Sequence, residues 1–307
     1  METHNCIKND YRATDYIKGV NSPLTSQVNV PNGDWTPYFH FRERQEFTWE
    51  TDCCVIFAAQ ESLDAYMDYL ISSGGVSAGT IEFFNQLGFM DTNSDDGKAH
   101  FHSSARYWSV LTGNGQNGNN LYDPWDVARK YGCIPWSKLP FDATTTIQEY
   151  FAPIPQNLLD LGQQFLIGVG GKQWVGYHWI QNGGACPFPA MDSVRQQSPL
   201  CIGVNVGTDW NEVEPPIPQV GLPAGHSIAN FARNSAGELI EDHYLPFEKT
   251  LVNGYPIPQV MQPVLLIVPP PPAPTVPVPV PVMTTQQDLT WLQALAAWLK
   301  GILGTLQ

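Results

Sequence analysis

The run of prolines from Pro269 to Pro281 most constrains what this chain can fold into. Proline lacks an amide hydrogen and has a fixed φ angle, so the run can form neither a helix nor a central strand. At about 3.1 Å per residue, we expect an extended polyproline II spacer of roughly 40 Å. The run therefore separates a globular body from the end of the chain, and we predict a linker over residues 268–284.

Residues 285–307 have the pattern of an amphipathic helix. Thr285 and Asp288 have capping-box spacing, and apolar residues then recur every three or four positions. The near-heptad stripe consists of Leu289, Leu292, Ala296, Leu299, Leu303 and Leu306. So apolar a helix must be covered, and we expect it to self-associate or to dock on a partner. A membrane interface is the alternative, which the tryptophans favour and the lack of a basic face opposes.

The charge balance excludes one class of partner. The chain has 15 Lys+Arg against 29 Asp+Glu, a formal net charge of −14. Such a surface repels phosphate backbones, so we expect no binding to nucleic acid. The first ten residues lack the apolar core of a signal peptide, and no stretch of about 20 apolar residues predicts a spanning helix. We therefore expect no secretion by that route.

The cysteines are scattered without a repeated C-x-x-C spacing. Neither a zinc site nor a disulfide framework is indicated, and we expect mostly reduced thiols, no metal and no cofactor.

The globular body has a helical first half and a β second half. Helical patterns cover residues 53–72, 81–88, 103–112 and 123–132, after a polar, irregular arm over residues 1–44. Residues 198–206 resemble a strand, and residues 226–244 resemble a β-hairpin. This order predicts an α+β fold.

Two adjacent thiols, Cys53 and Cys54, stand where the first of these helices begins. The backbone N–H groups and dipole of a helix start favour negative charge, which lowers the pKa of a thiol there. The thiolate is a nucleophile when a base accepts its proton. The competing interpretation is structural, because cysteine is among the most commonly buried residues.

A base and a group to orient it occur in the β half. His226 begins one strand of the predicted hairpin and Asp242 ends the other, so a tight hairpin could place them side by side. The glycine and asparagine run Gly113–Asn120 forms either a surface turn or the wall of a cleft that pairs with an extended peptide.

In this order the landmarks resemble those of the papain-like cysteine peptidases. Cys54-Val55-Ile56-Phe57-Ala58-Ala59 is similar to the family's C-W-A-F-S-A at the start of the central helix. Asp242-His243-Tyr244 stands in place of its N-S-W triplet, 242 − 226 = 16 residues after the histidine. Gly115-Gln116-Asn117-Gly118-Asn119 is similar to its G-x-N-G-G cleft segment.

The resemblance implies a two-lobed domain over residues 45–267, with the nucleophile in a helical lobe and the histidine in an antiparallel β lobe. It implies a triad of Cys54, His226 and Asp242, and substrate contacts at Asn117, Gly118 and Asn119. The family's oxyanion glutamine stands six residues before the cysteine, where this chain has Thr48. Gln45, nine residues before Cys54, is the candidate instead.

Either thiol of the pair could be the nucleophile, and the spacing to Phe57 favours Cys54. The implied reaction is hydrolysis of peptide bonds in a peptide or protein substrate through a thioester. The Asp-His-Tyr triplet is most similar to papain-like proteins of tailed phages and uncultured bacteria, which implies a cytoplasmic or virion-associated setting.

Two alternatives share the same landmarks. One is an inactive papain-like protein with a structural or binding role in a phage particle or surface assembly. The other is a cell-wall peptide amidase, although we recognise no wall-binding module.

The remaining histidines and tryptophans have structural interpretations. We expect His100 and His102 at the surface, His178 packed among aromatic rings and His243 as a bystander of the triad. Trp174, Trp179 and Trp210 either fill the core, which we favour, or line the cleft.

Overall fold

The computed structural model describes residues 6, 11, 12, 14, 15, 17, 28–182, 188–206, 210 and 225–267, with no account of the side chains of 188–190. These residues belong to one compact unit, Met1–Pro270. The predicted linker, 268–284, and the predicted C-terminal helix, 285–307, lie outside the described residues. Both stay predictions, as does the division of the chain into an arm and a body.

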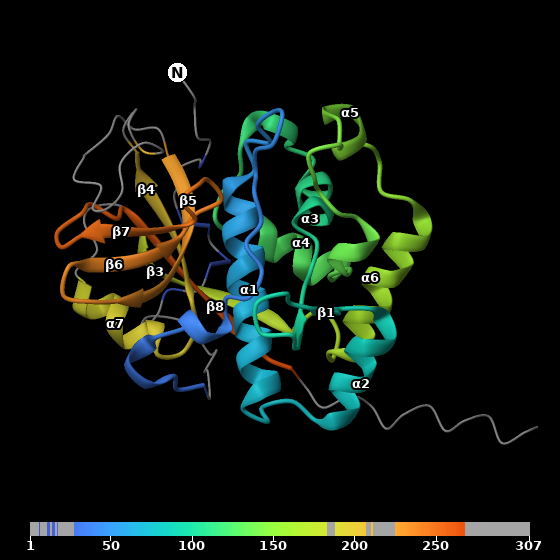
Figure 1. Ribbon diagram of the computed structural model, residues 1–307, viewed down its shortest axis with the longest axis horizontal. Helices are drawn as coiled ribbons and strands as arrows, with labels where there is room; N and C mark the ends of the chain where they lie inside the picture. Colours follow the sequence, from blue (N-terminus) through green and yellow to red (C-terminus); the bar gives the residue numbers. More distant parts are fainter. Residues whose placement is uncertain are drawn as a thin grey trace, which may run out of the picture. The chain divides into compact units, whose positions relative to one another are not determined.

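Helices and strands separate into two lobes (Figure 1). The helical lobe contains α1 (Cys54–Ser72), α2 (Ala78–Leu87), α3 (Ala105–Thr112), α4 (Asp123–Tyr131), α5 (Ile147–Tyr150), α6 (Gln156–Gly168) and a hairpin of β1 (Met90–Thr92) and β2 (Ala99–Phe101). The β lobe contains β3 (Val175–Asn182), β4 (Leu200–Asn205), β5 (Gly225–Arg233), β6 (Gly237–Glu241), β7 (Glu248–Val252), β8 (Gln259–Leu265) and α7 (Phe188–Arg195). Short 3-10 turns cover Pro31–Gly33, Thr36–Tyr38, Gly115–Asn117 and Trp136–Lys138.

Helix α1 lies between the two lobes. It packs against β5, β4 and β8 on one side and against α3 and α4 on the other. Its residues from Cys54 to Asp68 are buried all round, as expected of a helix inside a core rather than on a surface. The helix ends at Ser72, and Gly74 follows with φ of 75°, a left-handed conformation that glycine adopts without strain. The position of α1 brings its first residues to the junction of the lobes.

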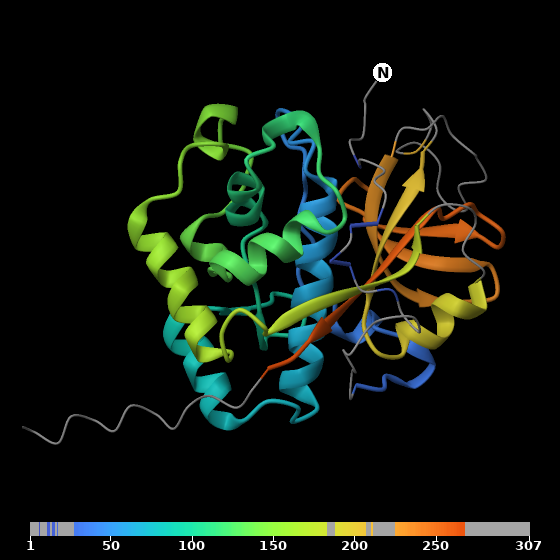
Figure 2. The same cartoon turned by 180° about the vertical axis from the view of Figure 1, so that it is seen from behind.

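The β lobe is a six-stranded sheet in the order β3-β8-β4-β5-β6-β7, and every neighbouring pair is antiparallel. Figure 2 shows β3 and β8 running from the helical lobe into the sheet. His226 lies opposite Val204 of β4, and the chain leaves β6 at Glu241, immediately before Asp242. The sheet therefore places the start of β5 and the end of β6 close to the start of α1.

The predicted α+β class is confirmed. The predicted helices correspond to α1, α2, α3 and α4, and the predicted strand and hairpin correspond to β4, β5 and β6. We did not predict the helices α5, α6 and α7 or the strands β1, β2, β3, β7 and β8. Five successive residues of β3 are buried, so it lacks the alternation that identifies a half-exposed strand. No helix in the described part of the chain is long and apolar enough to cross a membrane.

The described part of the predicted arm is packed on the body. Trp35 is fully buried, and its main-chain N–H donates to the carbonyl of Phe231 at 2.8 Å. Its indole N–H donates to the carbonyl of Arg195 at 2.5 Å. Residues 39–44, which we call the strap, then lead to Gln45 and the start of α1.

Candidate active site

His226 and Asp242 form the centre of the site in the β lobe. His226 is the second residue of β5, and its Nε2 lies 2.7 Å from Oδ1 of Asp242. The other carboxylate oxygen of Asp242 accepts from the indole N–H of Trp210 at 2.6 Å and from the ammonium of Lys249 at 2.6 Å. All four side chains are buried. The predicted hairpin therefore does bring the histidine and the aspartate together.

Burial and charge set the protonation of this pair. Burial by itself would raise the pKa of Asp242, but His226 and Lys249 hold it well below its ordinary value. Burial lowers the pKa of His226, and the neighbouring carboxylate only partly offsets this effect. The structure therefore favours an ionised aspartate beside a neutral imidazole at neutral pH.

The two cysteines at the start of α1 face different lobes. The Cys54 thiol lies near the main chain of Ser227, the residue after His226, and this main-chain group lowers the pKa of the thiol. The Cys53 thiol lies 3.3 Å from the carbonyl of Thr51, and Ser109 of the helical lobe is near enough to lower its pKa. Only Cys54 of the pair therefore lies beside the strand that carries the histidine.

Cys54 is fully buried. Burial raises the pKa of its thiol well above the ordinary value, the nearby Cys6 raises it further, and the main chain of Ser227 partly opposes both effects. The structure therefore describes a neutral thiol and a neutral imidazole rather than an ion pair.

Gln45 lies close to the start of α1, as the main-chain hydrogen bond from Thr51 N–H to its carbonyl at 3.2 Å shows. Its side-chain NH₂ donates to Oε1 of Glu50 at 2.8 Å and to the hydroxyl of Tyr244 at 2.5 Å. Tyr244 in turn donates to Oε2 of Glu50 at 2.6 Å. Both amide hydrogens of Gln45 are therefore engaged by protein groups.

The glycine and asparagine segment forms one wall beside these groups. Asn117 ends a 3-10 turn and is exposed, Gly118 has φ of 80°, and Asn119 is buried. Asn119 pairs as a parallel bridge with Cys6, whose N–H donates to the carbonyl of Gly225 at 2.7 Å. The main chain at Cys6 therefore lies between this wall and the residue that precedes His226.

The sequence did not point to several polar partners in this site. Trp210 is buried, as predicted, but its N–H also holds Asp242. Nothing in the surrounding residues distinguishes Lys249 or Glu50, since each acquires its partners only through the fold. His243, which we expected to be a bystander of the triad, is buried, and its Nδ1 lies 3.2 Å from Oε1 of Glu61.

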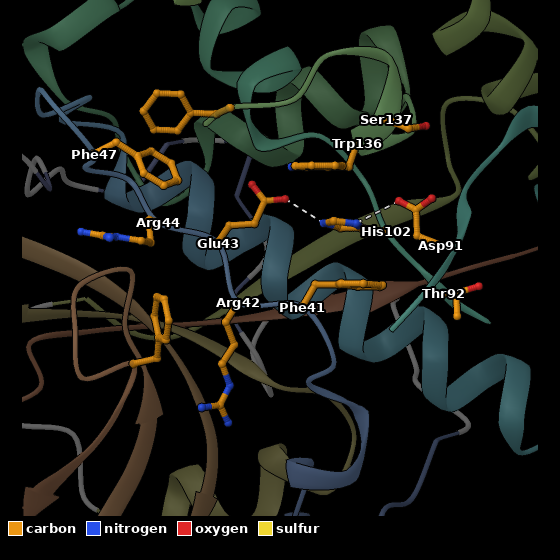
Figure 3. A pocket seen from close by; sticks show the side chains of 12 residues that line it. Phe41, Arg42, Glu43, Arg44, Phe47, Asp91, Thr92, His102, Trp136 and Ser137 are labelled. Carbon is orange, nitrogen blue, oxygen red and sulfur yellow. Dashed lines mark hydrogen bonds and ion pairs between the residues drawn. The ribbon is translucent and has the colours of Figure 1, made fainter. Parts of the chain in front are cut away.

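A second polar cluster lies on the strap (Figure 3). His102 is buried, which corrects the prediction of a surface residue: its Nδ1 lies 3.0 Å from Asp91 and its Nε2 2.9 Å from Glu43. Its ring stacks between those of Phe41 and Trp136. Burial would lower the pKa of His102, but the two carboxylates raise it to about 9. The adjoining pocket has a volume of about 600 Å³.

Comparison with known proteins identifies the architecture. No protein-family model and no curated protein matches the sequence. Among solved structures, the chain is similar to xylellain, a cysteine protease from Xylella fastidiosa, with a TM-score of 0.56 and 13% identity over 86% of this chain and 96% of that one. It is also similar to digestive procathepsin L 3 of the Tenebrio molitor larval midgut (TM-score 0.52, 12% identity, 86% of this chain and 77% of that one). Procathepsin B S9 from Trypanosoma congolense gives a TM-score of 0.51 at 10% identity, with 87% of each chain covered. The protein therefore has the two-lobed fold of the papain-like cysteine proteases.

Proposed function

We propose that this protein is a thiol-dependent hydrolase that cleaves peptide bonds with Cys54, His226 and Asp242. One observation carries the proposal: the first residue of α1 presents its thiol to the main chain of Ser227, and the adjacent His226 is hydrogen-bonded to an ionised carboxylate. A nucleophile, a base and an orienting group are the three parts that this chemistry needs.

In the proposed reaction the proton of the Cys54 thiol passes to His226, and the thiolate attacks the carbonyl carbon of the substrate. Nε2 of His226 is engaged by Asp242, so Nδ1 is the nitrogen that accepts this proton. The tetrahedral intermediate collapses to a thioester as His226 returns the proton to the leaving amine. Water, deprotonated by His226, then hydrolyses the thioester and restores the thiol.

The oxyanion that forms in both steps needs hydrogen-bond donors. The main-chain N–H of Cys54 is one candidate, because the first amides of a helix have no partner within the helix. Gln45 is the second, although its amide would have to release Glu50 or Tyr244 to reach the oxyanion. Asn117, Gly118 and Asn119 would pair with the extended main chain of the substrate, at the place where Asn119 pairs with Cys6.

A second candidate function is that of an inactive papain-like protein with a structural or binding role. Specific observations favour it: Cys54 and His226 are fully buried, the pKa of the thiol is raised, and the Gln45 amide is engaged elsewhere. We prefer a latent enzyme, because Cys6 is near enough to raise the pKa of the Cys54 thiol and pairs with Asn119, where the substrate would pair.

The finer setting rests on the sequence alone. From the sequence we propose a virion-associated or cytoplasmic location and a relation to phage-encoded proteins. We also propose, on the same basis, a docking role for residues 285–307, and we keep the cell-wall amidase as an alternative function.

Thiol labelling with an iodoacetamide-type or epoxide probe at near-neutral pH tests the proposal. Once the main chain at Cys6 is displaced, labelling should be fast; Cys54→Ala should then abolish it, and His226→Ala should slow it to the rate of an ordinary thiol. Cys53→Ala is the matched control and should leave the rate unchanged. Mass spectrometry of the labelled peptide identifies the modified cysteine.

Displacing the main chain at Cys6 distinguishes a latent enzyme from an inactive protein. If Cys54 labels slowly both in the native protein and after that displacement, the hydrolase proposal fails and the structural role stands. If labelling becomes fast and depends on both Cys54 and His226, a panel of peptides and cell-wall peptides then defines the substrate.

A further inference from the structure

A cluster of three metal-ligating side chains lies outside the candidate active site. Nitrogen atoms of His40 and His100 and a carboxylate oxygen of Asp96 all lie within 4.8 Å of one another. His40 belongs to the strap, and the other two belong to the hairpin of β1 and β2. The fold therefore joins donors that are far apart in the sequence, which explains why no metal-binding motif was visible there.

The two imidazole rings are stacked with their centroids 3.3 Å apart and an angle of 20° between their planes. Nε2 of His100 lies 3.0 Å from Oδ2 of Asp96. Two histidine nitrogens and one carboxylate oxygen form a donor set that suits zinc and related divalent transition metals, with a fourth position open to water.

Groups around the cluster hold the donors in place. The second ring nitrogen of His100 lies 3.7 Å from Asp68, a buried residue of α1 whose other oxygen accepts the N–H of Phe101 at 2.8 Å. Asp96 accepts the N–H of Lys98 at 2.9 Å. A carboxylate behind a ligating histidine is the usual outer shell of a metal site, because it fixes the orientation of the ring.

The strap is anchored at the same place from its own side. The side-chain amide of Asn93 donates to the carbonyl of His40. A cavity of about 650 Å³, lined in part by His40, Asn93 and Asp96, opens beside the cluster and leaves room for a metal and its water. We propose that His40, Asp96 and His100 bind one divalent transition metal ion of the zinc type.

Such an ion would fasten the strap to the hairpin. The strap already has one fixed point, since Glu43 and Asp91 both contact His102 (Figure 3). A metal at His40 would add a second, at the other end of the segment that leads into Gln45. The proposed role is structural and does not depend on the proposed hydrolase activity.

Cobalt(II) titration of the full chain tests the site, with zinc as competitor. We expect one cobalt per chain, visible bands of a four-coordinate ion and no thiolate charge-transfer band, because no ligand is sulfur. His40→Ala and His100→Ala should each weaken binding by more than 100-fold, and Asp68→Asn by about 10- to 100-fold. Zinc should also raise the thermal midpoint of the native chain and not that of the two histidine variants.

Asp96→Asn and Asp95→Asn form a matched pair, since each removes one negative charge from the hairpin and only Asp96 belongs to the cluster. The Asp96 side chain is partly exposed, so this variant should fold even if a histidine variant does not. Weaker binding in Asp96→Asn alone supports the proposal. Absence of binding, equal effects of the two variants, or a thiolate band that disappears with Cys54→Ala would overturn it.

Discussion

The two sides of the candidate active site differ in how their polar groups are satisfied. On the β side, Asp242 has a partner for each carboxylate oxygen and holds His226 between fixed neighbours. On the helical side, Cys54 is a neutral, covered thiol, and the Gln45 amide is engaged by Glu50 and Tyr244. In the proposed reaction, His226 is thus already oriented as a base while Cys54 is still covered, so activation would have to change the helical side.

The largest predicted effect is a loss of stability when the ion pair of Asp242 on the β side is removed. Lys249→Met removes the cation that neutralises buried Asp242 and leaves an uncompensated charge. We expect a loss of about 3–5 kcal/mol in the free energy of unfolding, measured by denaturant titration at neutral pH. Arg129→Met is the control, because its pair with Asp126 is partly exposed and should contribute less than about 1 kcal/mol. Equal losses would show that the Asp242 network does not stabilise this lobe.

The next effect concerns the strap on the helical side. His102→Phe keeps an aromatic ring between Phe41 and Trp136 and removes the charge that pairs with Glu43 and Asp91. The folded-state pKa of His102 is raised to about 9, above its unfolded value, so its contribution is complete below about pH 6.5 and is lost as pH rises through 9.

The variant should therefore lose more stability at pH 6 than at pH 10. The difference should be up to about 3 kcal/mol, since each tenfold change in proton affinity is equivalent to about 1.4 kcal/mol. Denaturant unfolding of the native protein and His102→Phe at both pH values measures it. A loss that is the same at both would mean that His102 is uncharged in the folded protein.

A third prediction concerns the covering of the thiol. In Gly225→Ala the added Cβ would clash with the main chain of Cys6 and displace it from the wall at Asn119. We expect the labelling rate of Cys54 to rise about tenfold, as the loss of roughly 1.4 kcal/mol of contact implies. Gly203→Ala is the milder control, because its Cβ would meet Cys6 only at the thiol, 3.5 Å away. An unchanged rate in Gly225→Ala would show that Cys6 does not limit access.

The smallest effect should come from releasing the Gln45 amide. Tyr244→Phe removes one of its two acceptors and also the hydroxyl that donates to Glu50. One net hydrogen bond is worth about 0.5–1.5 kcal/mol, so the rate of thioester formation should rise about two- to tenfold. Comparing the variant with Gln45→Ala and with the double mutant isolates the contribution of Gln45. If Tyr244→Phe has the same effect with and without Gln45, then Gln45 is not an oxyanion donor.

Local signals predicted the parts of the fold that depend on local chemistry. The helix that begins at Cys54, the glycine stop after Ser72 and the hairpin between His226 and Asp242 all follow from residues within a few positions of one another. The pairing of β3 with β8 joins residues such as Val175 and Leu265, which no local pattern relates. The sheet order was therefore beyond the reach of the sequence.

In the candidate site, too, the sequence predicted the contact that depends on nearby residues and missed those that depend on distant segments. His226 and Asp242 have a fixed spacing in one hairpin, and their contact follows from it. Lys249 and Trp210 reach Asp242 from separate segments, and His102 is buried because Phe41 and Trp136 enclose it from both sides. Such environments exist only after the chain has folded, so the sequence could name the candidate groups of the site and not their protonation.

The ladder between β3 and β8 has a mechanical consequence. Its Val175 end is joined to the helical lobe, where Leu266 N–H donates to the carbonyl of Trp174 at 2.6 Å and Trp174 packs on Phe165 of α6. Its other end continues into the sheet, where Gln259 lies opposite Gly203 of β4. The paired strands β3 and β8 thus connect the two lobes, and moving the lobes apart would distort the hydrogen bonds between these strands. In the proposed hydrolase, a substrate would therefore gain entry by removal of a cover and not by rotation of the lobes about a hinge.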